Sequence, residues 1–113
     1  MNDKLRQAFD AAMAESIALY EQGEFARAFQ HLELAHVLGQ KYVVPHIATH
    51  YRMLRIGVKM RSPAQVWGQL IRIVLGALGS AVGVVPVGNT GGTNVGMFRR
   101  MPVDDRVREL MEP

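Results

Sequence analysis

Residues 19–28 read LYEQGEFARA, and this stretch decides the fold because it predicts the turn of a helical hairpin. Apolar residues recur at spacings of three and four on both sides of it, which is the period of an α-helix. Gly23 interrupts that period and separates a first helix, expected over residues 3–22, from a second helix, expected over residues 25–38. The sequence therefore predicts an antiparallel helical hairpin over residues 1–38.

A second pair of helices is expected downstream of the hairpin. Pro45 suits the first position of a third helix over residues 46–60, because the amide proton that proline lacks has no partner there. Ser62 and Pro63 then predict the cap and the first residue of a fourth helix, so that the pair occupies residues 46–80. The last turns contain glycines, each of which costs a helix about 1 kcal/mol relative to alanine: Gly76, Gly79 and Gly83. Either close packing against another helix justifies them, or the helix stops early.

The C-terminal part contains a loop and one short helix. Residues 84–101 are rich in glycine and proline, which is typical of a loop made of turns. A short helix is expected after Pro102, with Asp104 and Asp105 near its N-terminus, where carboxylates stabilise the helix dipole. The length limits the chain to one modest core. We therefore predict one all-α domain over residues 1–113: a small bundle of four main helices, a Gly-rich loop and a short C-terminal helix.

The hairpin turn carries a local resemblance. Residues 19–35 resemble one tetratricopeptide-like helical hairpin, in which a small residue permits a close turn and two alanines, here Ala28 and Ala35, let the helices lie against each other. No second copy follows, and helical repeats need about three units to form a continuous core. The resemblance implies a local packing arrangement and not a peptide-binding solenoid.

The composition narrows the classes of site. The chain has no cysteine, which excludes disulfides, thiolate nucleophiles and cysteine-ligated zinc or iron–sulfur clusters. Any metal site must therefore use histidine and carboxylate. Residues 1–7 lack the basic-then-apolar order of a secretory signal, so a cytoplasmic protein is the expectation. Residues 73–87 carry no charge but are shorter than the roughly 20 residues that span a bilayer.

Charge is distributed unevenly along the chain. Residues 1–33 hold six acids and three bases, residues 34–103 hold eight bases and no acid, and residues 104–113 hold four acids and two bases. An acid-free stretch of this length is typical of an anionic partner, a membrane surface, or a fold whose ends cover its middle.

All four histidines fall within twenty residues of the sequence. At about 100° per residue, His36 lies on the apolar face of the second helix, and His46 and His50 lie one turn apart on a single face of the third. His31 lies nearer the edge of its helix. Three histidines are therefore predicted to point toward the core from two consecutive helices.

This arrangement favours a metal site between the second and third helices. The i,i+4 spacing of His46 and His50 puts two imidazoles within reach of one ion. Glu33 and His36 form a Glu-x-x-His step, by which helical bundles offer one carboxylate and one imidazole to iron or manganese. The resulting three-nitrogen, one-oxygen set suits zinc, iron or copper. Further candidate ligands lie at the edges of the helices: His31 and Glu15.

A structural polar network is the alternative interpretation of the same histidines. Each buried neutral imidazole needs partners for both ring nitrogens, and neighbouring histidines and buried water can supply them. A carboxylate-rich di-metal centre is disfavoured, because only one Glu-x-x-His step occurs. The sequence identifies no catalytic residue.

A basic stripe of Arg52, Arg55 and Lys59 lies opposite the histidines on the third helix. It indicates either a solvated surface or contact with an anion or partner, and Arg72 on the fourth helix is a further candidate for binding a carboxylate or phosphate. The alternative function is thus a non-catalytic interaction module that uses the hairpin or the stripe to bind a protein partner or a second copy. Nucleic acid is disfavoured because no aromatic residues alternate with the bases, whereas peripheral membrane contact stays open.

Several strings carry a resemblance over nearly the whole chain. They are HLELAHVLGQ at residues 31–40, His46-x-x-x-His50 followed by Met53-Leu54, Gly68-Gln69, and PVGNTG at residues 86–91. With them the chain resembles the uncharacterised, mostly bacterial domain-of-unknown-function family 3703. The resemblance implies a small helical protein and supplies no activity.

Overall fold

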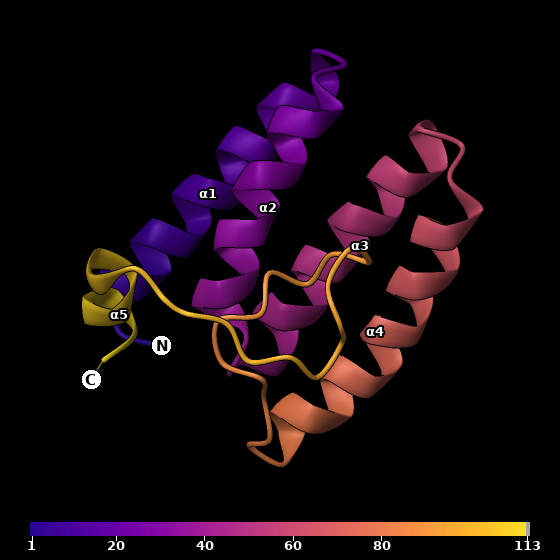
Figure 1. The fold of residues 1–113 in the computed structure, drawn as a ribbon. Helices are drawn as coiled ribbons and strands as arrows, with labels where there is room; N and C mark the ends of the chain where they lie inside the picture. Colours follow the sequence, from indigo (N-terminus) through magenta and orange to yellow (C-terminus); the bar gives the residue numbers. More distant parts are fainter. Residues whose placement is uncertain (113) are drawn as a thin grey trace.

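The computed structural model describes residues 1–112 and contains helices α1 to α5 (Figure 1). No strand occurs in these residues, so the all-α prediction is confirmed. The helix bounds are Asp3–Glu21 for α1, Phe25–Gly39 for α2, Val43–Lys59 for α3, Pro63–Ala81 for α4 and Asp105–Met111 for α5. The four long helices form two pairs, α1 with α2 and α3 with α4, and α2 also packs against α3.

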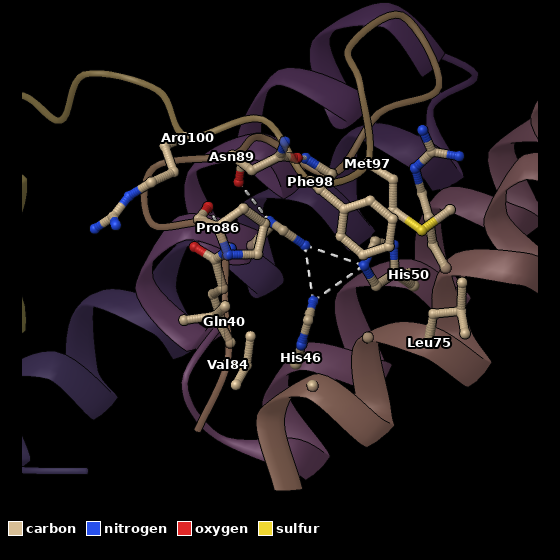
Figure 2. A pocket seen from close by; sticks show the side chains of 16 residues that line it. Gln40, His46, His50, Leu75, Val84, Pro86, Asn89, Met97, Phe98 and Arg100 are labelled. Carbon is tan, nitrogen blue, oxygen red and sulfur yellow. Dashed lines mark hydrogen bonds between the residues drawn. The ribbon is translucent and has the colours of Figure 1, made fainter. Parts of the chain in front are cut away.

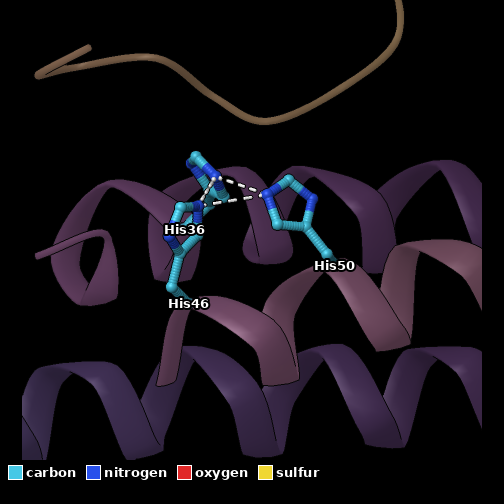
Figure 3. A group of neighbouring side chains, drawn as sticks. All are labelled: His36, His46 and His50. Carbon is cyan, nitrogen blue, oxygen red and sulfur yellow. Dashed lines mark hydrogen bonds between the residues drawn. The ribbon is translucent and has the colours of Figure 1, made fainter. Parts of the chain in front are cut away.

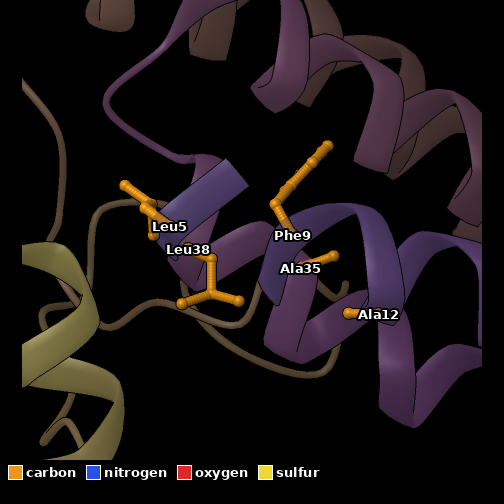
Figure 4. Close-up of a cluster of buried hydrophobic side chains, with 5 residues drawn as sticks. All are labelled: Leu5, Phe9, Ala12, Ala35 and Leu38. Atoms are coloured by element: carbon orange, nitrogen blue, oxygen red, sulfur yellow. The ribbon is translucent and has the colours of Figure 1, made fainter. Parts of the chain in front are cut away.

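The α1–α2 hairpin packs as its apolar period predicts. The Asn2 side chain accepts a hydrogen bond from the Leu5 amide and caps α1. One core cluster fills the end of the hairpin near the chain termini (Figure 4), with α5 packed against it: Leu5, Phe9, Ala12, Ala35 and Leu38. The small side chain of Ala35 is fully buried, which lets the two helices approach closely.

A second core cluster joins the hairpin to α3. It comprises Leu19, Ala28, Leu32, Met53 and Ile56, each of which is almost inaccessible to solvent. Burial of a side chain such as Leu32 stabilises the folded state by about 1.5–3 kcal/mol. The cluster therefore fixes α3, and with it the histidine face of α3, relative to α2.

The boundaries of α3 and α4 differ from the expected ones. Helix α3 begins at Val43 and not at residue 46, because proline is tolerated throughout the first turn, where amide protons lack helical partners. Helix α4 continues to Ala81 through its glycines. A Cβ atom at Gly76 would lie 2.9 Å from Cε1 of His46, so close packing against α3 accounts for this glycine.

Helix α4 shows a contrast between its two faces. Its fully buried residues are the polar Gln69 and Ser80. The opposite face exposes apolar side chains at spacings of three and four, which we call the α4 apolar face: Trp67, Leu70, Ile71, Val74 and Leu78. Even so, none of the helices in residues 1–112 is sufficiently long and apolar to cross a membrane.

The segment between α4 and α5 folds back over α2, α3 and α4 (Figure 1), and its Thr93 reaches Gln65 near the start of α4. Asn89 organises it from within, because its side-chain amide donates to the carbonyls of Gly96 and Arg99 at 2.8 Å each and its side-chain oxygen accepts from the Gly91 amide at 2.9 Å. Helix α5 then begins at Asp105, capped by Asp104, as predicted. The loop is therefore a packed part of the fold that covers the histidine-bearing faces.

Candidate metal centre

Three histidine side chains from two helices meet in the interior (Figure 3). Their Nε2 atoms form a nearly equilateral triangle. The separations are 3.0 Å between His36 and His46, 3.0 Å between His36 and His50, and 3.1 Å between His46 and His50. Each residue is at most 4% exposed. The inward face predicted for these residues is thus the observed one.

The other ring nitrogens of His36 and His50 contact oxygen atoms. Nδ1 of His36 lies 2.7 Å from the backbone carbonyl oxygen of Asn89, to which it donates. Nδ1 of His50 lies 2.6 Å from the side-chain oxygen of Gln69. The amide nitrogen of Gln69 donates to the Gly91 carbonyl at 3.0 Å, which fixes the oxygen toward His50. Both imidazoles therefore carry their proton on Nδ1.

His46 is oriented in the same way through a chain of two hydrogen bonds. Its Nδ1 lies 2.5 Å from the hydroxyl oxygen of Ser80, and that hydroxyl donates its own proton to the Gln40 carbonyl at 2.7 Å. The Ser80 oxygen is therefore an acceptor toward His46. Nδ1 of His46 accordingly bears the proton as well.

These partners leave three Nε2 lone pairs directed at one another. A hydrogen bond within the triangle would need a proton on one Nε2, yet each neutral ring has its single proton on Nδ1. Three unprotonated nitrogens about 3 Å apart repel one another unless a cation lies among them. The three histidines could therefore hold a metal ion, with their rings oriented by hydrogen bonds to a carbonyl, an amide and a hydroxyl.

Burial keeps the three rings neutral. Desolvation lowers the pKa of His36 well below its ordinary value, and the charges that His50 and His46 would carry lower it further. Desolvation also lowers the pKa of His46 and that of His50 to about 4. At pH 7 all three imidazoles are therefore in the form that binds a metal ion.

The triangle has the dimensions of a three-histidine site. Metal–nitrogen bonds to imidazole are about 2.0–2.1 Å long, so an ion bonded to all three Nε2 atoms would lie about 1 Å out of their plane. The three nitrogens would hold such an ion from one face, which would leave room for water or substrate on the other.

A cavity of about 350 Å³ lies beside the triangle (Figure 2). Its polar wall comprises the three histidines, Gln40, Asn89 and two arginines, Arg72 and Arg100. The remaining wall is mainly apolar, from α4 and the loop: Leu75, Val84, Val85, Pro86, Met97 and Phe98. The open positions of an ion at the triangle would face this cavity.

One comparison with known proteins identifies the family. The family described as Protein of unknown function (DUF3703) matches residues 3–111. The chain belongs to the DUF3703 family. No curated protein and no solved structure matches this DUF3703 chain. The tetratricopeptide-like resemblance of residues 19–35 stays a prediction.

Three of the predicted ligands of this DUF3703 protein lie outside the triangle. Glu33 is half-buried on α2 and lines a different cavity, beside Phe29. Desolvation raises the pKa of Glu33, and a hydrogen bond with the Thr90 side chain partly offsets this effect. His31 is half-buried and Glu15 is exposed. Glu33 lies one turn from His36 on α2, but its carboxylate meets Thr90 of the loop and not the histidine triangle.

The predicted basic residues fall into two groups. The guanidinium carbons of Arg52 and Arg55 each lie 5.1 Å from the ring centroid of Tyr20 on α1, and Lys59 is exposed. The stripe therefore contacts α1 through an aromatic ring. Arg72, by contrast, is half-buried and lines the cavity together with the three histidines.

Sequence reasoning missed the residues that orient the imidazoles. Gln69, Ser80 and Asn89 are all buried, and each contacts a different histidine. Gly91 belongs with them, because its φ of +85° suits glycine and a Cβ atom there would lie 2.6 Å from Cδ2 of His36. The available signals were the Gly68-Gln69 and PVGNTG strings that carry the DUF3703 resemblance, whose roles the structure now supplies.

Proposed function

We propose that the protein binds one transition-metal ion, zinc, iron or copper, through Nε2 of His36, His46 and His50. The convergence of three unprotonated nitrogens supports this proposal. An apolar core offers no other favourable use for three lone pairs at about 3 Å, and imidazole suits all three metals. The hydrogen bonds to Nδ1 raise the basicity of the rings and hold them in place for the ion.

The structural polar network is the competing function for the same residues. It requires at least one proton or one bridging water among the three Nε2 atoms. The lowered pKa values of His46 and His50 disfavour the proton at pH 7. The three outer partners leave no ring nitrogen other than Nε2 free to change its role.

Elemental analysis of the protein produced without an affinity tag tests the proposal. We expect about one metal ion per chain after loading with Zn²⁺, Fe²⁺ or Cu²⁺ followed by desalting. The free energy of unfolding should rise by about 4 kcal/mol when the free metal concentration is about 1,000 times its dissociation constant. Substoichiometric metal with an unchanged unfolding transition would contradict the proposal.

Two matched variants on α2 show whether the metal sits at the triangle. His36→Gln removes one Nε2 ligand, whereas His31→Gln makes the same change outside the triangle. Loss of a residue that only orients a ligand typically weakens metal binding about tenfold to a hundredfold. We expect a larger loss for His36→Gln and no change for His31→Gln. Equal affinities for two folded variants, checked by circular dichroism, would place the ion elsewhere.

A spectroscopic test addresses the protonation pattern directly. Two-dimensional ¹H–¹⁵N spectra that detect imidazole nitrogens distinguish Nδ1–H from Nε2–H. In the metal-free protein at pH 7 we expect Nδ1–H for His36, His46 and His50. An Nε2–H signal from any of these rings would support the polar network instead.

A second candidate function is binding of a partner protein or a second copy through the α4 apolar face. Its support is the exposure of Trp67 (67%), Val74 (60%) and Leu78 (61%) on one helix side. Sedimentation of the wild type and of Trp67→Gln tests self-association. A monomer at all concentrations would exclude the second copy as the occupant.

A further inference from the structure

The cavity beside the triangle has an uncompensated positive charge. All residues that line it lie between His36 and Arg100, inside the stretch that contains no carboxylate. The ion pair found within residues 1–112 joins Arg108 to Asp105, and neither of these residues lines the cavity. Residues 1–112 thus supply no carboxylate counter-ion to Arg72 or to a metal at the triangle.

Arg72 is held in a fixed position in the cavity wall. Its two terminal nitrogens donate to the carbonyls of Gly68 and Val95, each at 3.1 Å. Its Nε atom is buried and has no hydrogen-bond partner in the described chain. The charge of Arg72 also lowers the pKa of His36 and His50, as expected for a cation close to the triangle. Arg72 thus has one unpaired N–H and, within residues 1–112, no carboxylate partner, so an anion in the cavity would balance its charge.

The rest of the cavity wall favours an anion that also carries an apolar group. Its apolar wall is partly accessible, since Val84 is 71% exposed and Phe98 is 75% exposed. Figure 2 shows both side chains around the space in front of the triangle. An apolar group between them would be removed from water, whereas a small polar anion would leave this wall unused.

We infer that the cavity binds a small organic carboxylate that carries an apolar group. The inference rests on the proposed metal site. The carboxylate completes the coordination of the ion and neutralises Arg72, and the apolar group packs between Val84 and Phe98. An inorganic anion such as phosphate shares the first two contacts but not the third.

Cobalt(II)-loaded protein provides the test, because the visible spectrum of cobalt responds to a change in its ligands. Phenylacetate is the probe, phenylacetamide is its neutral counterpart, and inorganic phosphate is the polar anion. We expect phenylacetate to change the spectrum saturably, at concentrations at least about tenfold below those that phosphate requires. Phenylacetamide should produce no comparable change.

Two variants that each remove a contact with the loop distinguish the effect of the Arg72 charge on binding from a general effect on loop packing. Arg72→Gln removes the charge, whereas Thr93→Val removes another loop tether, the 2.7 Å bond to Gln65, outside the cavity. Arg72→Gln should weaken phenylacetate binding by about tenfold or more, the usual loss for a hydrogen bond to a charged group. Thr93→Val should retain wild-type binding.

The outcomes distinguish this inference from the metal proposal, because cobalt content is measured in each sample. One cobalt per chain with no spectral response to phenylacetate would overturn the carboxylate inference alone. Equal binding to Arg72→Gln, or equal binding of phosphate and phenylacetate, would also overturn it. A protein that retains no metal would overturn both.

Discussion

The α1–α2 hairpin buries mainly apolar side chains, whereas the half formed by α3, α4 and the loop buries mainly polar ones, apart from Met53 and Ile56 of α3. The hairpin contributes to both apolar clusters of the core. Helix α4 buries only Gln69 and Ser80, and the loop buries Asn89 through hydrogen bonds. Buried polar groups contribute little net stability but fix positions strongly once every partner is present. We conclude that the hairpin mainly stabilises the fold and that the other half mainly positions the histidines.

The largest effect expected from a single substitution is loss of stability in the hairpin. Leu32→Ala should lower the free energy of unfolding by about 2–5 kcal/mol, because Leu32 is fully buried between α2 and α3. Leu34→Ala, on the same helix but 39% exposed, is the control. Urea denaturation in the presence of a chelator measures both changes. Equal losses for the two variants would contradict the division of roles.

The polar half should instead make stability depend on pH. Folding lowers the pKa of His46 and of His50 from about 6.5 to about 4, so the unfolded chain binds more protons between these values. The metal-free protein should therefore lose stability as the pH falls from 6.5 to 4, by an amount of the order of 3 kcal/mol for each of the two histidines. Urea denaturation at intervals between pH 7 and pH 4 measures this loss. A free energy of unfolding that stays constant over the range would show that the rings are not buried in the neutral form.

A smaller effect is expected when one outer partner of the histidines is removed. Gln69→Leu deprives Nδ1 of His50 of its acceptor, so metal affinity should fall by about tenfold to a hundredfold. Gln65→Leu is the matched control, since Gln65 lies on the same helix and contacts the loop through Thr93 but touches no histidine. Competition with a coloured zinc chelator measures both affinities. Similar losses would mean that loop packing, and not the orientation of His50, determines metal binding.

The same two halves differ in how far the sequence predicts them. Local helical period predicts the hairpin and the inward faces of His36, His46 and His50, because it depends on neighbours three and four residues away. It cannot predict that Nδ1 of His36 meets the Asn89 carbonyl, 53 residues later in an aperiodic loop. Nor can it predict that Glu33 meets the Thr90 side chain of the same loop and lies outside the group of three histidines.

Close packing between helices explains the glycines of α4, whose role the sequence did not determine. The glycines of α4 were ambiguous between a helix end and a tight helix contact. The ring of His46 decides this for Gly76, because it occupies the space that a side chain would fill. Such contacts involve two elements at once, so the pattern within one element predicts that they exist but not where they form.

The smallest expected effect concerns the basic stripe, which belongs to neither role. Arg52→Gln, Arg55→Gln and Lys59→Gln together should lower the free energy of unfolding by only about 1 kcal/mol, the value of exposed contacts such as those with Tyr20. Metal affinity should not change, since the stripe lies on the side of α3 away from the triangle. Calorimetry measures the loss of stability in the triple variant and in Tyr20→Leu, the matched change on α1. Similar losses would mean that the contacts between the arginines and the Tyr20 ring account for both. A loss of stability for the triple variant several times larger than that for Tyr20→Leu would mean that the arginines also stabilise the half formed by α3, α4 and the loop. Helix α3 would then belong both to the part that stabilises the fold and to the part that positions the histidines.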